Sequence, residues 1–310
     1  MSLSQENQMI KTRKIHKMYK SKPTLEGAGV HLHRAFGFGD TRTFDPFLLL
    51  DDFRNDSPKN YLPGFPWHPH RGMETITYVL RGLVQHGDSM GNHGAITAGD
   101  VQWMTAGSGI IHQEMPEGDP DGRMYGFQLW ANLPQPNKMM DPRYQEVKRA
   151  QIPVVTLEHN VIVRVICGEV AGVHGPVEDI VTDPQYLDIT VPAKTRFAFP
   201  TSSGHTVFAY IIDGKATFCD EKDPFAYERE GSNYFDTQHD LEMGDRTLVV
   251  FDDGEQILIN TEDNSVRLLL ISGRPIREKV AWYGPIVMNT EAELRTAFEE
   301  LEKGTFVKKG

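Results

Sequence analysis

The 310-residue chain has few cysteines, no long apolar run and a deficit of positive charge. Its two cysteines, Cys167 and Cys219, lie far apart in strand-like apolar stretches, so we expect reduced thiols rather than a disulfide framework. No stretch approaches the roughly 18 apolar residues of a membrane span, and the first residues lack the apolar core of a signal peptide. The sequence therefore predicts a cytoplasmic protein that does not cross a membrane.

The charge balance argues against two classes of partner. The 32 Lys and Arg residues and 43 Asp and Glu residues give a net charge of -11. This sign repels phosphate backbones and anionic lipid, so we expect neither direct nucleic-acid binding nor membrane binding. Hydrophobic residues at 39% are typical of a globular protein, and the length predicts two domains or two halves of one large fold.

Short runs rich in β-branched and aromatic residues alternate with Gly, Pro, Asp and Asn along almost the whole chain. They include TITYVL, NVIVRVICG, YLDITVP and VRLLLIS. This spacing predicts an all-β fold, either a barrel or a sandwich.

The pattern changes near the C-terminus. Thr290 and Glu293 form a plausible capping box. Apolar residues then recur at helical spacing, at Leu294, Ala297, Phe298 and Leu301. We expect a C-terminal helix whose apolar face packs on another surface.

The two halves contain a weak internal repeat. The string YVLRG at residues 78–82 is similar to YIIDG at residues 210–214, and a Gly-Asp pair follows each, at Gly99-Asp100 and Gly244-Asp245. These features predict a duplicated β-barrel linked through the proline-rich and polar residues 133–153. Chance similarity between two β-hairpins is the alternative.

Histidines are concentrated in one region, where five of the 12 fall between positions 68 and 112. His68 and His70 are separated by one residue, as are His112 and Glu114. Residues i and i+2 of a strand point to the same side. Two such pairs on facing strands supply three nitrogens and one carboxylate oxygen to a single divalent cation, so the sequence predicts a metal site.

Other histidines carry weaker indications. His31 and His33 have the same spacing but no second pair, and we expect them to lie on a surface strand. His86 and His93 flank a glycine-rich turn. They are either donors that orient a metal ligand or turn residues without a function.

Longer strings resemble known families. Residues 64–82, GFPWHPHRGMETITYVLRG, resemble the first cupin motif, and residues 99–116, GDVQWMTAGSGIIHQEMP, resemble the second. Together with YGPIVMNT at residues 283–290, they more narrowly resemble the pirin family, over nearly the whole chain. The resemblance implies an all-β bicupin, with two tandem cupin barrels (double-stranded β-helices) and a C-terminal α-helix.

We place the N-terminal metal-binding barrel at residues 1–140, and the C-terminal barrel with the helix at residues 141–310. The resemblance implies one divalent metal ion per chain, held by His68, His70, His112 and Glu114. Fe(II) is the expected ion, although these ligands also accept Mn, Co, Ni, Cu or Zn. Glu74 stands at the general cupin glutamate position, which is not a ligand in pirins.

The repeat predicts that the second barrel binds no metal. Aligning the two halves places Pro200, Ser202, Ile257 and Ile259 at the four ligand positions. The histidines left in this half are isolated from one another, and we expect them to be hydrogen-bonded or surface residues: His174, His205 and His239.

The resemblance also implies an activity like that of quercetin 2,3-dioxygenase, in which a flavonol is cleaved with O2 and carbon monoxide is released. Glu114 would be the catalytic base. A flat aromatic substrate needs an apolar slot. The candidates for its walls are Phe47, Phe65, Trp67, Trp103, Met104, Phe127 and Trp130. The alternative is a non-enzymatic, iron-binding, redox-sensitive regulator that binds a protein partner. In bacteria, the resemblance also allows a metal-binding metabolic regulator that docks on another enzyme.

Overall fold

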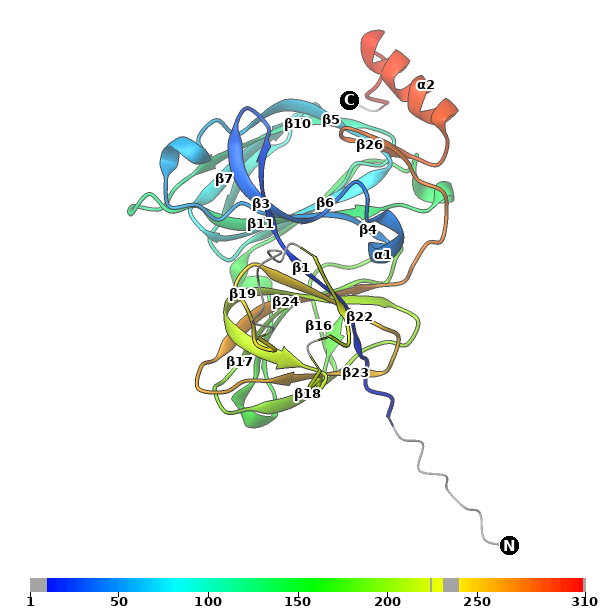
Figure 1. Ribbon diagram of the computed structural model, residues 1–310. Helices are drawn as coiled ribbons and strands as arrows, with labels where there is room; N and C mark the ends of the chain where they lie inside the picture. The colour runs from blue at the N-terminus through cyan, green and yellow to red at the C-terminus, as the bar shows by residue number, and fades with distance from the viewer. Residues whose placement is uncertain (1–9, 224, 231–239, 309–310) are drawn as a thin grey trace, which may run out of the picture.

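The computed structural model describes residues 10–223, 225–230 and 240–308, and it forms two β-rich units, one above the other in Figure 1. Within these residues, no helix is long and apolar enough to cross a membrane. The helices that the described residues form are α1 (Thr41–Phe44), α2 (Glu291–Glu302) and the short 3-10 helices η1 (Pro58–Asn60), η2 (Gln135–Asn137), η3 (Arg149–Gln151) and η4 (Glu158–Asn160).

The upper unit in Figure 1 consists mainly of two antiparallel sheets. The seven-stranded sheet has the order β12 (Arg143–Val147), β9 (Val101–Thr105), β6 (Met73–Arg81), β11 (Tyr125–Asn132), β4 (Phe47–Asp52), β3 (Val30–Phe36) and β2 (Lys22–Glu26). The four-stranded sheet has the order β5 (Phe65–His70), β10 (Ile110–Glu117), β7 (Leu83–Asp88) and β8 (His93–Thr97).

The lower unit is built on one eleven-stranded sheet. Its main path is β13 (Val154–Thr156), β14 (Ile162–Cys167), β17 (Gln185–Val191), β24 (Val266–Gly273), β19 (Thr206–Phe218), β22 (Thr247–Phe251), β1 (Ile15–Lys20) and β20 (Glu228–Glu230). Off this path lie β18 (Arg196–Pro200), β21 (Met243–Gly244) and β23 (Gln256–Asn260).

Two small two-stranded sheets lie outside these larger sheets. One pairs β15 (Glu169–Val170) with β16 (Val173–His174), and the other pairs β25 (Ala281–Tyr283) with β26 (Ile286–Met288). The all-β architecture with a C-terminal helix is confirmed.

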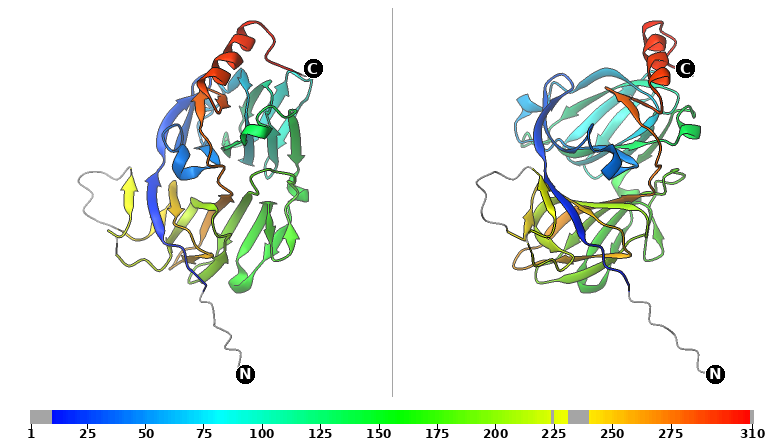
Figure 2. Two further views of the ribbon diagram at one scale, coloured as in Figure 1. Left: turned by 90° about the vertical axis from the view of Figure 1, so that its right-hand side faces the viewer. Right: turned by 45° about the vertical axis from the view of Figure 1, so that its right-hand side comes forward.

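Both ends of the chain cross between the units (Figure 2). Near the N-terminus, β1 pairs with β22 and β20 in the lower unit before the chain rises to β2. At the other end the chain leaves the lower unit after β24 and returns upward. There β25, β26 and α2 lie against the upper unit, where residues of this segment pack on Ile111. The division near residue 140 stays a prediction.

The C-terminal helix forms as its sequence predicts. The Glu293 backbone amide donates to Thr290 Oγ1 over 3.2 Å, and Glu293 Oε2 accepts from the Thr290 amide over 2.9 Å. This capping box satisfies free amides of the first turn. The apolar face packs into a cluster with the β25–β26 hairpin and Phe306, through Leu294, Ala297, Phe298 and Leu301.

Aromatic side chains fill the contact between the two units. Phe208, on β19, places its ring edge-on against three rings of the upper unit, with centroids 5.4 to 5.5 Å apart: Phe36, Phe44 and Phe47. Such edge-to-face pairs add to the free energy of burial.

The two cysteines form no disulfide. Cys167 is buried and Cys219 is half-buried, and burial raises the pKa of each thiol to about 12.

Two buried hydrogen bonds at this contact are related by the internal repeat. Tyr78 and Asp52 lie opposite one residue of β11, and Tyr210 and Asp188 lie opposite one residue of β24. Across the contact, the Tyr78 hydroxyl donates to Asp188 Oδ2 over 2.7 Å, and the Tyr210 hydroxyl donates to Asp52 Oδ2 over 2.9 Å. Each unit therefore gives the other the same tyrosine–aspartate bond, which supports duplication over chance similarity.

Removing either hydroxyl leaves a buried carboxylate with one donor fewer. We expect Tyr78→Phe and Tyr210→Phe each to lower the free energy of unfolding by about 1–2 kcal/mol, the usual cost of such a loss. Urea unfolding measures this change, and Tyr283→Phe, at an exposed tyrosine, is the control. Unchanged stability in both interface variants would contradict the assigned role of these bonds.

Candidate metal centre

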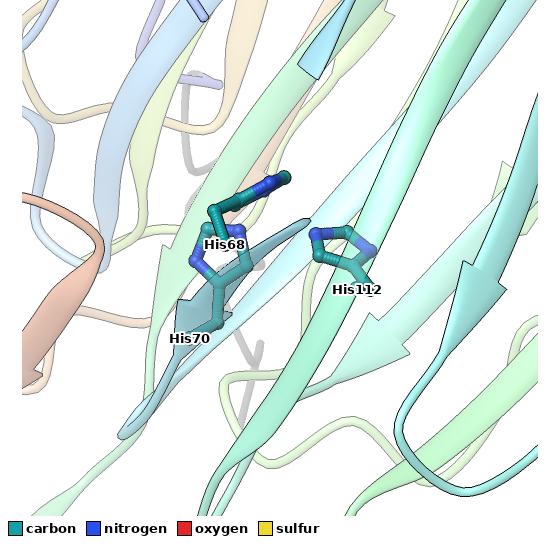
Figure 3. Close-up of side chains that lie close together, drawn as sticks. All are labelled: His68, His70 and His112. Atoms are coloured by element: carbon teal, nitrogen blue, oxygen red, sulfur yellow. The ribbon is translucent and has the colours of Figure 1, made fainter. Parts of the chain in front are cut away.

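The histidines of β5 and β10 meet inside the upper unit (Figure 3). His68 and His70 are two residues apart on β5, and His68 lies directly opposite His112 on β10. Their ring centroids are 4.4 to 5.0 Å apart. One nitrogen from each ring can be chosen so that all three lie within 4.8 Å of one another. The structure thus brings together three of the four residues of the predicted metal site.

Backbone carbonyls fix the orientation of two of these rings. His68 Nδ1 lies 2.8 Å from the Pro66 carbonyl oxygen, and His70 Nδ1 lies 3.2 Å from that of Pro285. A carbonyl only accepts, so both Nδ1 atoms carry the proton and both Nε2 atoms are left as bare acceptors. Both ring nitrogens of His112 are buried, and among the described residues neither has a hydrogen-bond partner.

The electrostatics of the cluster favour neutral imidazoles. Burial lowers the pKa of His68. For His70 and His112, burial and the neighbouring imidazoles hold the pKa well below its usual range. Neutral, buried imidazoles with unused nitrogen lone pairs are good ligands for a divalent cation. The residues present therefore fit a metal ion.

The fourth predicted ligand, Glu114, lies beside the three histidines. Its Oε2 is 4.0 Å from His112 Nε2, which is too long for a hydrogen bond. Its Oε1 is 3.0 Å from the Thr77 hydroxyl, which donates to it. Burial raises the pKa of the Glu114 carboxyl to about 7. Glu114 is therefore a buried carboxylate next to the cluster, and its role as ligand or base stays a prediction.

The other histidines of this region lie outside the cluster. His86 is buried opposite Glu114 in the β7–β10 ladder, and its Nε2 lies 2.9 Å from Glu146 Oε1. It is thus a neighbour of the site, whereas His93 is exposed, with Nδ1 3.3 Å from the Gly91 carbonyl oxygen. Glu74, the general cupin glutamate position, instead accepts a 2.6 Å bond from Thr105 Oγ1.

The remaining histidines have separate surroundings. On β3, His31 is exposed and His33 Nε2 lies 3.3 Å from Arg246 Nη1. In the lower unit, His174 and His205 each lie near one carboxylate, at 3.6 and 3.9 Å. The last of the predicted isolated residues, His239, lies outside the described residues.

A cavity of about 580 Å³ opens onto the candidate metal centre. His68, His70 and Glu114 line it, and its walls are mostly apolar, with Leu32, Leu49, Phe53, Phe65, Trp130 and Trp282 among them. Of the aromatic and methionine side chains proposed for a slot, three line it: Phe65, Trp67 and Trp130. The others are buried in hydrophobic cores, namely Phe47, Trp103, Met104 and Phe127.

Inside the lower unit, apolar side chains pack against one another. Phe199, Ile257, Ile259 and Leu270 are among the apolar side chains packed there in one cluster. Ile257 and Ile259, which the repeat aligns with His112 and Glu114, are fully buried in it. These two positions therefore carry no metal-ligating side chain, and the wider expectation that this half binds no metal stays a prediction.

The returning C-terminal segment contributes to the site in a way that the sequence does not indicate. The turn between β25 and β26 supplies the Pro285 carbonyl to His70, and Trp282, Gly284 and Pro285 line the cavity. A backbone carbonyl has no residue-type signature, so no sequence pattern could indicate this contact. The string YGPIVMNT marked the segment only through family resemblance.

Two buried basic side chains hold this segment in place. Arg71 donates to the Phe306 carbonyl oxygen over 2.8 Å and lies 2.8 Å from a Glu300 carboxylate oxygen. Lys138 donates to the Val287 carbonyl over 3.0 Å and to that of Gly72 over 2.9 Å. Gly72 has φ +75°, and a Cβ there would lie 2.0 Å from the Val287 oxygen, so only glycine fits.

Known proteins resemble this chain over most of its length. The family model described as Pirin matches residues 29–131, and the Pirin C-terminal cupin domain matches residues 186–307. A Pirin-like protein of Caulobacter vibrioides is 40% identical over 95% of this chain and 99% of its own length. A Pseudomonas aeruginosa protein, provisionally named a quercetin 2,3-dioxygenase, is 37% identical over 96% and 99%. A crystal structure of quercetin 2,3-dioxygenase from Acinetobacter baumannii has a TM-score of 0.81 at 30% identity, covering 95% of this chain and 98% of that one.

The ligand assignment predicts about one divalent ion per chain. His70→Ala removes one of three converging imidazoles, so we expect metal content to fall close to zero. Elemental analysis after equilibrium dialysis measures it. A metal-dependent rise in melting temperature, present in the natural chain and lost in the variant, gives a second readout. His205→Ala is the control and should keep full metal content. Metal retained in His70→Ala, or half lost in His205→Ala, would contradict the assignment.

Proposed function

This chain belongs to the pirin family, and from that premise we propose that it is a metal-dependent dioxygenase. The proposed reaction cleaves a flavonol such as quercetin with O2 and releases carbon monoxide. We propose Fe(II) as the ion, with His68, His70, His112 and Glu114 as its ligands. The Acinetobacter baumannii structure named for this activity supports the proposal.

One observation carries the proposal: three neutral imidazoles lie beside a buried carboxylate, and His68, His70 and Glu114 line a mainly apolar cavity. Its volume of about 580 Å³ is within the usual range for small-molecule sites. Trp130 lies with its centroid 5.1 Å from that of His70, and Trp282 lies 6.1 Å from Trp130. Such aromatic walls suit a flat ring system and exclude water from the reacting end.

Each residue of the candidate site has a separate role in the proposed reaction. A divalent ion in this site supplies Lewis acidity and redox chemistry with O2. His68, His70, His112 and Glu114 would hold that ion. The Pro66 and Pro285 carbonyls keep the rings of His68 and His70 in the ligating orientation. Glu114 accepts the proton of the substrate hydroxyl when the hydroxyl enters the site. The Thr77 hydroxyl lies 3.0 Å from Glu114 Oε1 and 2.6 Å from Gln128 Oε1, and all three residues line the cavity.

The competing function is a metal-binding regulator that meets a protein partner. Exposed aromatic side chains at the cavity favour it, since Phe38 is 67% exposed and Trp67 is 55% exposed while both line the cavity. Such side chains are suited to a protein contact. A regulator needs no turnover, so a turnover assay separates the two functions.

The dioxygenase proposal predicts turnover by protein stripped of metal and reloaded with Fe(II). We expect loss of flavonol absorbance under air with one carbon monoxide released per quercetin consumed. His70→Ala, treated in the same way, is the control and should be inactive. Absence of carbon monoxide from protein with iron confirmed in the site would contradict the proposed function and favour the regulator.

The base role of Glu114 has its own test. Glu114→Gln keeps an oxygen near the ion but loses basicity, so part of the metal affinity should remain while turnover falls by about 100-fold or more. Glu117→Gln, at an exposed position of the same strand, is the matched control. Steady-state kinetics on samples with equal metal content measure the effect. Unchanged turnover in Glu114→Gln would rule out the base role.

A further inference from the structure

A row of polar side chains crosses the cavity wall. Arg34, Asp51, Gln128 and Thr77 are direct neighbours on β3, β4, β11 and β6. Because opposite residues of adjacent strands share a face, all four point to the same side, and all four line the cavity. The row ends at the candidate metal centre, where the Thr77 hydroxyl contacts Glu114.

The far end of this row is an ionic triad. Arg34 forks onto Asp51, with Nε to Oδ1 at 2.8 Å and Nη2 to Oδ2 at 2.7 Å. The remaining Arg34 nitrogen, Nη1, lies 2.8 Å from Glu26 Oε1. One guanidinium thus faces two carboxylates, and the triad has a net charge of -1. Each carboxylate oxygen can accept more than one hydrogen bond, so the triad still offers acceptors to a ligand.

The triad is poorly solvated on its inner side. Asp51 is 5% exposed, and burial raises the pKa of its carboxyl to about 6 although Arg34 opposes this shift. An anionic group on a ligand would be repelled here, because the triad already has a net charge of -1 and lies in a region of low dielectric. A neutral hydroxyl would instead donate to a carboxylate oxygen, and such charge-assisted bonds are among the stronger hydrogen bonds.

The spacing of the row sets the length of a ligand that reaches both ends. Adjacent strands lie about 4.8 Å apart, so Asp51 is roughly 10 Å from Thr77, the residue of the row that contacts Glu114. The walls between the two ends are apolar, with Leu49 and Trp130 on the same two central strands. A ligand that fits has a flat apolar body with polar groups at both ends.

We propose that Glu26, Arg34 and Asp51 form a subsite for the hydroxyl groups at the end of the substrate remote from the metal. This subsite selects neutral polyhydroxylated aromatic compounds and rejects analogues with an anionic group at that end. The inference rests on the proposed function in one respect, since the other end of the ligand occupies the candidate metal centre. Discrimination comes from attraction of the hydroxyl and repulsion of the anion together.

The test measures binding without turnover. Protein loaded with Zn(II), which has no redox chemistry, is titrated without O2 by following quenching of tryptophan fluorescence. Three sets of flavonols serve as probes. The first carries hydroxyls on both outer rings, and the second lacks the hydroxyls of one outer ring. The third carries a carboxylate where the second lacks a hydroxyl. We expect removal or replacement at one outer ring to weaken binding by about tenfold or more, the effect of losing a hydrogen bond to a charged group.

Glu26→Gln tests the subsite directly. Glu26 is 41% exposed, so the amide should be accommodated without unfolding, which a melting curve checks. The triad then becomes neutral, and the preference for hydroxyl over carboxylate should fall to about threefold or less. Glu299→Gln, at an exposed carboxylate paired with Lys303 on α2, is the control and should keep the natural preference.

The outcomes separate the subsite from the activity. Equal binding of the hydroxylated and carboxylated compounds, no binding of any of them, or an unchanged preference in Glu26→Gln would overturn the subsite. Selective binding that depends on Glu26, in protein that releases no carbon monoxide with Fe(II), would support the subsite while contradicting the proposed dioxygenase activity.

Discussion

The candidate site depends on the return of the C-terminal segment to the N-terminal unit. Arg71 and Lys138 supply the buried donors that hold this segment through the Phe306 and Val287 carbonyls. The segment in turn brings the Pro285 carbonyl to His70 and Trp282 to the cavity wall. A ring whose Nδ1 is fixed by an acceptor presents Nε2 in one direction. Residues 282–285 therefore complete a site whose histidines all come from the first half of the chain.

The same architecture serves different purposes in the two units. The reciprocal bonds of Tyr78 and Tyr210 show that corresponding strands face each other across the contact. In the lower unit, apolar side chains pack in one interior cluster, and the positions aligned with two of the predicted metal ligands are isoleucines. In the upper unit, a polar row from Arg34 to Thr77 crosses an otherwise apolar cavity. We infer that the lower unit stabilises the assembly, while the upper unit binds the metal ion and the ligand.

The sequence alone indicates those features that depend on local spacing. The pairing of His68 with His70, the capping box of Thr290 and the alternation of strands all follow from periods of two or from helical geometry. The features it does not indicate depend on long-range contacts. The Arg34–Asp51 fork joins two strands across one register position, and the Pro285 carbonyl approaches His70 from 215 residues away. The cavity walls are a mixed case, because an aromatic side chain on a predicted strand gives no sign of which face it occupies.

X-ray absorption of the metal-loaded chain tests the central claim most directly, because it reports the number and type of atoms bound to the ion. The account predicts one ion per chain, with three imidazole nitrogens and one carboxylate oxygen from the protein at about 2.0 to 2.2 Å. A spectrum with fewer than three imidazoles, or with sulfur ligands, would contradict it. So would a second ion bound with the same affinity, since the lower unit has Ile257 and Ile259 at the positions that the repeat aligns with His112 and Glu114.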